Sequence, residues 1–185
     1  PSGGSTGPLW GFTLSVIHLL GLPVVWGTHV LGFLVLWACS IMGFHISKTL
    51  FKESKPLALL TGSMVAMEWH LVWSALSGME TIVLILISLG VFYWALKNFD
   101  NWWLPGILIG ISIWVRPDGI TLVGPILISF IFRKKPFKKS LAAAFQFLGS
   151  LTLVASSYFI FNYFVAGDIW PNTFYAKQAE YLNLQ

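Results

Sequence analysis

The chain has 185 residues, of which 56% are hydrophobic and only 10% are charged, and its mean hydropathy is +0.76. Soluble domains carry about 25% charged residues, so this composition excludes an ordinary soluble domain and predicts an all-α, polytopic integral membrane protein. The net charge of +4 arises mainly in short basic loops, which report orientation in a membrane and not binding of nucleic acid. The sequence contains no P-loop, GxGxxG, CxxC or HExxH motif, so nucleotide-dependent chemistry has no support.

The first third of the chain predicts a loop, one short helix and two membrane spans. Residues 1–8 are rich in Gly, Ser and Pro, and residues 10–22 are apolar. A bilayer core of ~30 Å requires about 20 apolar residues, so the segment 10–22 is too short to cross it and we predict an interfacial helix. Residues 24–46 and 57–76 are long and apolar enough to cross, and we predict that both are spans.

The second predicted span carries two titratable residues, Glu68 and His70, between Trp69 and Trp73. Charged groups within a span are expected to face the interior of the helix bundle. Positions i and i+2 diverge on a helix, so these two side chains alone do not predict a metal site. We expect Glu68 and His70 to support a polar site without touching its ligand.

A third span is predicted over residues 82–96, and the turn at 77–81 precedes it. Glu80 in this turn lies at the start of the span, where the helix dipole favours an anion by a fraction of a kcal/mol. Glu80 is therefore either a helix cap or part of a binding site. Trp102 and Trp103 follow the next polar loop and are expected to form an interfacial aromatic belt.

A charged turn interrupts the next apolar run. The arms 102–115 and 120–132 are each about 20 Å long as helices, too short to cross alone. Arg116-Pro117-Asp118-Gly119 lies between them, and a charge at bilayer depth costs about 2.5–3.5 kcal/mol. Broken backbone there is tolerated only where it lines a cavity or is buried in protein. We predict that Arg116 and Asp118 form the wall of a polar pit; an ordinary surface hairpin with snorkelling ends is the alternative.

The last span is predicted over residues 142–166, which gives about six membrane segments in addition to the short interfacial helix near the N-terminus. We treat 1–185 as a single partial domain: 1–23 as the end of an outer loop with its short helix, 24–166 as the transmembrane helices, and 167–185 as the start of an extracytoplasmic segment. The chain begins in a Gly/Ser loop without Met, so we expect it to be a fragment of a longer protein.

The basic residues predict the orientation. If the spans alternate, the loops at 48–55, 97–101 and 133–139 share one side, and they contain nine of the eleven Lys and Arg residues. The positive-inside rule makes this side cytoplasmic. Arg116, Asp118, Glu80 and the tail residue Lys177 then share the outer side. Cations there suit a phosphate-bearing lipid, and carboxylates suit sugar hydroxyls, a divalent metal or an acceptor proton.

Three motifs carry a resemblance to a known family. SGMET (77–81), RPDG (116–119) and PNTFYAK (171–177) resemble motifs of the type-C (GT-C) membrane glycosyltransferases, in particular the terminal arabinofuranosyltransferase-like proteins of the mycobacterial cell wall. The opening TGPLW (6–10) resembles the end of the first large outer loop of such proteins. Met79 in place of Leu and Gly7 in place of Ser are departures from the family pattern.

The resemblance implies transfer of a sugar from a polyprenyl-phosphate donor to an extracytoplasmic glycan or lipid acceptor, at a bacterial plasma membrane. It implies that Arg116, with Lys177, holds the donor phosphate and that Asp118 and Glu80 bind sugar hydroxyls or order the outer loops. Asn172 and Tyr175 would line the acceptor side. The family's general base lies in the first outer loop, so the resemblance places it before Pro1 and implies that this fragment is inactive alone. It leaves a metal requirement open.

Two other functions remain open from the residues. A transporter or flippase also needs intramembrane charges, a broken helix pair and an outward pit. A non-catalytic membrane scaffold would use Arg116 and Asp118 only as a structural ion pair.

Overall fold

The computed structural model describes residues 7–97, 100–132 and 136–169, and over these residues every element of secondary structure is a helix. The elements in chain order are α1 (Pro8–Leu19), α2 (Val24–Leu50), α3 (Lys55–Met67), α4 (Trp69–Leu76), α5 (Thr81–Lys97), α6 (Trp103–Val115), the 3-10 helix η1 (Pro117–Leu122), α7 (Val123–Ile131) and α8 (Phe137–Ala166). This agrees with the predicted all-α fold class.

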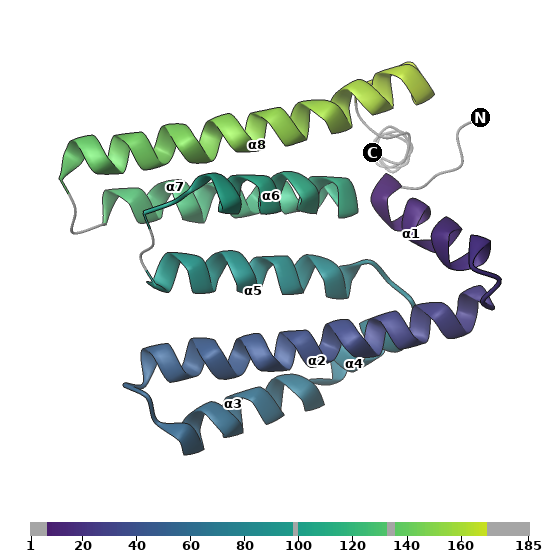
Figure 1. Cartoon of the computed structure of the whole chain (residues 1–185), viewed down its shortest axis with the longest axis horizontal. Helices are drawn as coiled ribbons and strands as arrows, with labels where there is room; N and C mark the ends of the chain where they lie inside the picture. The colour runs from purple at the N-terminus through teal and green to yellow at the C-terminus, as the bar shows by residue number, and fades with distance from the viewer. Residues whose placement is uncertain (1–6, 98–99, 133–135, 170–185) are drawn as a thin grey trace, which may run out of the picture.

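The helices run back and forth along one direction, as Figure 1 shows. α2 packs against α3, α4 and α5, while α6 packs against α5 and α8. α2 and α5 end, and α8 begins, at one end of the bundle. α5 begins, and α6 and α8 end, at the other end, which α1 crosses. The alternating course predicted from the spans is therefore present.

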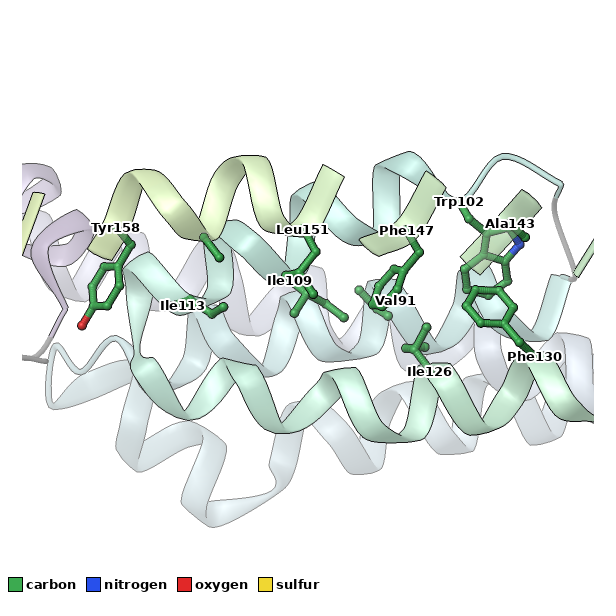
Figure 2. Close-up of a cluster of buried hydrophobic side chains, with 11 residues drawn as sticks. Val91, Trp102, Ile109, Ile113, Ile126, Phe130, Ala143, Phe147, Leu151 and Tyr158 are labelled. Carbon is green, nitrogen blue, oxygen red and sulfur yellow. The ribbon is translucent and has the colours of Figure 1, made fainter. Parts of the chain in front are cut away.

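The larger core cluster lies between α6, α7 and α8 (Figure 2). Its fully buried members include Ile109, Phe147 and Tyr158. Trp102 is only 1% exposed and packs edge-on against Phe130, with ring centroids 4.6 Å apart. The prediction that Trp102 belongs to an interfacial belt was wrong, because its ring fills the core where α6, α7 and α8 meet.

Two glycines of α6 bring α8 close. A Cβ at Gly106 would collide with Ser150 and the Phe147 carbonyl oxygen, and one at Gly110 would collide with Val154. The spacing of these glycines places both on one face of α6, and small residues at this spacing let helix backbones approach each other.

Lysines mark the end of the bundle opposite α1. Lys48 at the end of α2 forms an ion pair of 2.7 Å with Glu53 in the following loop. The hydrogen bond from Lys48, together with the nearby charge of Lys97, holds the pKa of the Glu53 carboxyl below its ordinary value. α2 and α5 end on this same side of the bundle (Figure 1), as the positive-inside argument assumed.

The boundaries differ from the predicted spans in three places. α2 continues to Leu50, and α8 begins at Phe137, five residues before the expected start. The span predicted over 57–76 is not one helix, because it breaks at Glu68 into α3 and α4. Within the described residues, two helices, Val24–Leu50 and Phe137–Val165, are long and apolar enough to cross a membrane by themselves. This fits a helical membrane bundle, and the number of about six segments stays a prediction.

Candidate functional site

The two charged turns meet at the end of the bundle that α1 crosses. One turn joins α4 to α5 and carries Glu80; the other joins α6 to η1 and carries Arg116. Arg116 has extended backbone (φ −153°, ψ 133°), which ends α6. The following Pro117 explains this conformation, since a proline disfavours the helical region for the residue before it and favours extended backbone.

Gly119 lets the second turn fold back onto α6. Gly119 is buried, and a Cβ there would collide with the Ser112 hydroxyl and lie 2.8 Å from the Ser112 carbonyl carbon. Its amide donates to the Arg116 carbonyl oxygen at 2.9 Å. Pro117 and Gly119 thus fix the turn that follows Arg116 and pack it against Ser112 of α6.

The guanidinium of Arg116 joins the two turns. Its Nη1 donates to Glu80 Oε1 at 3.3 Å and to Thr81 Oγ1 at 3.1 Å. Its Nε and Nη2 donate to Asp118 Oδ2 at 3.2 Å and 2.8 Å. The predicted association of Arg116, Asp118 and Glu80 is therefore present, and Thr81 is a fourth member that the sequence interpretation did not assign. Thr81 adjoins Glu80 in the SGMET motif, which was the available signal.

The two carboxylates differ in exposure. The side chain of Arg116 is 30% exposed, that of Glu80 is 20% exposed and that of Asp118 is 65% exposed. One cation and two anions give this cluster a formal charge of −1, so it is not a ready-made anion site. A phosphate could reach the guanidinium only if the exposed Asp118 moved aside, whereas Glu80 is held between the turns. We call Arg116, Glu80, Thr81 and Asp118 the ion cluster.

Glu68 and His70 lie elsewhere and behave differently from the prediction. Glu68 caps α4, accepting from the Leu71 amide at 2.8 Å, and its other oxygen lies 2.7 Å from His70 Nδ1. The two side chains meet because the helix is broken at Glu68, where the i and i+2 rule for a continuous helix does not apply. Their side chains are 41% and 69% exposed, so the expectation that they face the bundle interior was wrong. In the part of the chain that the structure describes, Arg116 bonds to neither of them.

Three predicted site residues, Asn172, Tyr175 and Lys177, lie outside the described residues, as does the motif that contains them. Within the described ranges, no three His, Cys, Asp or Glu residues are grouped so that they could hold a metal ion. The ion cluster contains two carboxylates, and the guanidinium of Arg116 forms an ion pair with each of them.

An apolar groove of about 500 Å³ lies between α1 and α2. Its lining contributes one hydroxyl, that of Thr13, which already donates to the Leu9 carbonyl oxygen at 2.9 Å. The other lining residues are aliphatic, aromatic, proline or glycine: Val16, Ile17, Leu22, Pro23, Trp26, Gly27, Val30, Leu31 and Leu34. The chemistry of this groove suits an apolar chain.

Comparison with known proteins adds no relative: no family model, no curated protein and no solved structure matches this chain. Function is therefore inferred from the residues and their geometry.

Proposed function

We propose that this chain is the membrane part of a glycosyltransferase that moves a sugar from a polyprenyl-phosphate donor to an extracytoplasmic glycan or lipid acceptor, and that Arg116 binds the donor phosphate. The observation that carries the proposal is the meeting of the SGMET and RPDG turns through Arg116, Glu80 and Thr81. Two motifs that resemble those of one family form one polar cluster, although Arg116 is 36 residues from Glu80 and 35 residues from Thr81 in the sequence.

The surroundings of the cluster support a membrane location. α2 and α8 are long and apolar enough to cross a bilayer. Large apolar side chains cover the outside of the bundle; Trp26 is 71% exposed, Met67 80% and Phe164 81%. Soluble monomers rarely expose such a continuous apolar surface. The lysines at the opposite end favour an extracytoplasmic position for the cluster.

The geometry suggests how a donor would bind. A phosphate would replace Asp118 at Nη2 and Nε of Arg116, while Glu80 keeps the guanidinium in place through Nη1. The released Asp118 carboxylate would then accept hydrogen bonds from sugar hydroxyls. We assign binding and not base catalysis to these residues, since Glu80 and Asp118 are both paired with Arg116.

The groove between α1 and α2 gives the polyprenyl chain an apolar place at the same end of the bundle. Burial of apolar surface there contributes roughly 25 cal/mol per Å², so an isoprenoid phosphate should bind more tightly than inorganic phosphate.

The test uses farnesyl phosphate, a short isoprenoid phosphate, with the chain in dodecyl maltoside micelles. Arg116→Ala removes charge-assisted hydrogen bonds that are worth about 1.5–3 kcal/mol, so we expect its Kd to rise by about 10-fold or more. Arg116→Lys should give a smaller loss, because it keeps the charge but not the two-pronged geometry. Lys97→Ala, at the opposite end of the bundle, is the matched control and should leave the Kd unchanged. Equal affinities for all three variants would refute the phosphate assignment.

A transporter or flippase is the second candidate. It is favoured by the two helix interruptions at charged residues, Glu68 and Arg116, since broken helices with charged groups mark substrate pathways in transporters. Movement of a fluorescent isoprenoid phosphate across proteoliposomes, with no sugar transfer by any longer form of the protein, would favour this candidate over the transferase.

A further inference from the structure

The first turn of helix α1 contacts the backbone of the turn that carries Glu80 of the ion cluster. The indole Nε1 of Trp10 donates to the carbonyl oxygen of Gly78 at 3.1 Å, across 68 residues of sequence. Gly78 has φ 68°, a conformation that favours glycine, and lies two residues before Glu80. Trp10 therefore fixes the turn that presents Glu80 to Arg116.

The residue before α1 touches the other turn. Gly7 is buried, and a Cβ at this position would collide with the carbonyl oxygen of Val115, the residue before Arg116. Only glycine allows the chain to approach the end of α6 this closely. Gly7 also begins α1, since its carbonyl oxygen accepts from the Trp10 amide at 3.1 Å. The start of α1 thus contacts both turns of the ion cluster, through Trp10 at Gly78 and through Gly7 at Val115.

A third contact is made by a row of three aromatic side chains. Phe12 of α1 packs edge-on against Phe161 of α8, with ring centroids 5.8 Å apart. Phe161 in turn lies 5.3 Å from Trp114, two residues before Arg116. α8 and the two turns are therefore all contacted from this end of α1, by Gly7 and by residues in the first half of the helix.

The second half of α1 is held far less. The helix has no buried residue between its ends, and Leu19 is 82% exposed. In this half Ile17 packs against Gly27 of α2, and the apolar groove lies beside this contact. A helix that packed only to fill the bundle would bury a continuous stripe along its length. α1 buries no such stripe, and its hydrogen bond to Gly78 and its ring contact with Phe161 both lie in its first half, next to the ion cluster.

We propose that the first turn of α1 is a positioning element for the ion cluster, in which Trp10 and Gly7 hold the Glu80 turn and the end of α6 at the separation that the Arg116–Glu80 bond requires. Neither residue touches a ligand; both act through the backbone next to Glu80 and Arg116. The positioning itself does not depend on the proposed function. The inference rests on that function only in taking the ion cluster as the site of the donor phosphate.

A double-mutant cycle tests the positioning role. Trp10→Phe removes the indole N–H but keeps an aromatic ring, and Glu80→Gln removes the charge that pairs with Arg116. Each single substitution should lower the melting temperature of the chain in dodecyl maltoside by about 2–4 °C. If Trp10 positions Glu80, the double variant should lose about 2 °C less than the sum, because the first change has already weakened the bond that the second removes. Gly7→Ala should couple to Glu80→Gln in the same way and serves if Trp10→Phe does not fold.

The control cycle pairs Trp10→Phe with Glu53→Gln, which breaks the ion pair with Lys48 at the opposite end. Distant sites are additive, so these two losses should sum. Backbone hydrogen exchange gives an independent measurement: residues 78–83 should exchange faster in Trp10→Phe than in Trp26→Phe, whose indole lies on the groove. Additive losses in the Trp10–Glu80 cycle, or equal exchange in both tryptophan variants, would overturn the proposal. Neither measurement needs a substrate, so a failure of farnesyl phosphate binding leaves this test intact.

Discussion

Among the described residues, one apolar stretch is interrupted at Glu68 and another at Arg116, and the two places are built differently. Glu68 is satisfied by its neighbours, the Leu71 amide and the His70 ring, which are three and two residues away. Arg116 is satisfied partly by Asp118 next to it and partly by Glu80 and Thr81, which are 36 and 35 residues away. Glu68 therefore ends one helix and caps another, whereas Arg116 joins two separate turns.

Glu68 is a local helix cap, whereas Arg116 belongs to a cluster that links distant parts of the chain. A helix cap needs only its own turn, and removing it affects that turn. A guanidinium shared between turns depends on the whole end of the bundle, and the side chain of Arg116 stays 30% exposed. If this view is correct, substitutions around Arg116 should change both stability and ligand binding, and substitutions around Glu68 should change stability alone.

The largest expected effect is at Gly119, which the Arg116 turn requires and for which the Glu68 break has no counterpart. A Cβ at Gly119 would meet Ser112, including its backbone, and overpacking of this kind costs about 1–3 kcal/mol. Gly119→Ala should therefore lower the melting temperature in micelles by about 2–12 °C and weaken farnesyl phosphate binding. The matched control is Gly124→Ala in α7, where a Cβ meets nothing within 4 Å. Equal melting temperatures for the two variants would show that the turn is not tightly packed on α6.

The next effect compares the two glutamates directly. Glu80→Ala removes a charge-assisted hydrogen bond from a carboxylate that is only 20% exposed, so we expect a loss of about 1.5–3 kcal/mol in the free energy of unfolding. Glu68→Ala removes a helix cap, which is worth about 1 kcal/mol. Reversible unfolding in mixed micelles measures both losses, and farnesyl phosphate titration should show weaker binding for Glu80→Ala only. A larger loss of affinity for Glu68→Ala would reverse the distinction between cap and site.

The fold was predictable where the sequence marks its own boundaries. Pro117 and Gly119 predicted the interruption at Arg116, and the apolar runs predicted α1, α2, α5 and α8 in the right order. The break at Glu68 was missed because no proline or glycine accompanies it; the signal was an acidic residue three positions before the Leu71 amide, which a capping side chain can reach. Trp102 was placed at a membrane interface because tryptophan is common there, but its neighbours Gly106 and Gly110 bring α8 close enough to bury it.

The site was predictable only in part. Arg116, Asp118 and Glu80 were placed together by topology and motif resemblance, and the bonds between them agree. The sequence could not show that Asp118 covers the guanidinium, because side-chain pairing depends on the fold of the turn. The sequence also could not show the hydrogen bond from Trp10 to the Gly78 carbonyl oxygen. No sequence pattern identifies the acceptor of a single indole N–H.

Asp118 gives the smallest effect on stability and the clearest test of function. Its side chain is 65% exposed, and exposed ion pairs contribute about 0–1 kcal/mol, so Asp118→Asn should leave the melting temperature nearly unchanged. It also removes the charge that competes with phosphate for Nη2 of Arg116, which changes the formal charge of the ion cluster from −1 to zero.

The most direct measurement is the Kd of farnesyl phosphate for Asp118→Asn and for the unsubstituted chain, with farnesol as the uncharged reference. If Arg116 is a phosphate site covered by Asp118, the variant should bind farnesyl phosphate about 3-fold to 10-fold more tightly, as expected when a competing charge is removed, and farnesol equally well. Unchanged or weaker binding of farnesyl phosphate by Asp118→Asn would contradict this account and leave the ion cluster as a structural link between two turns.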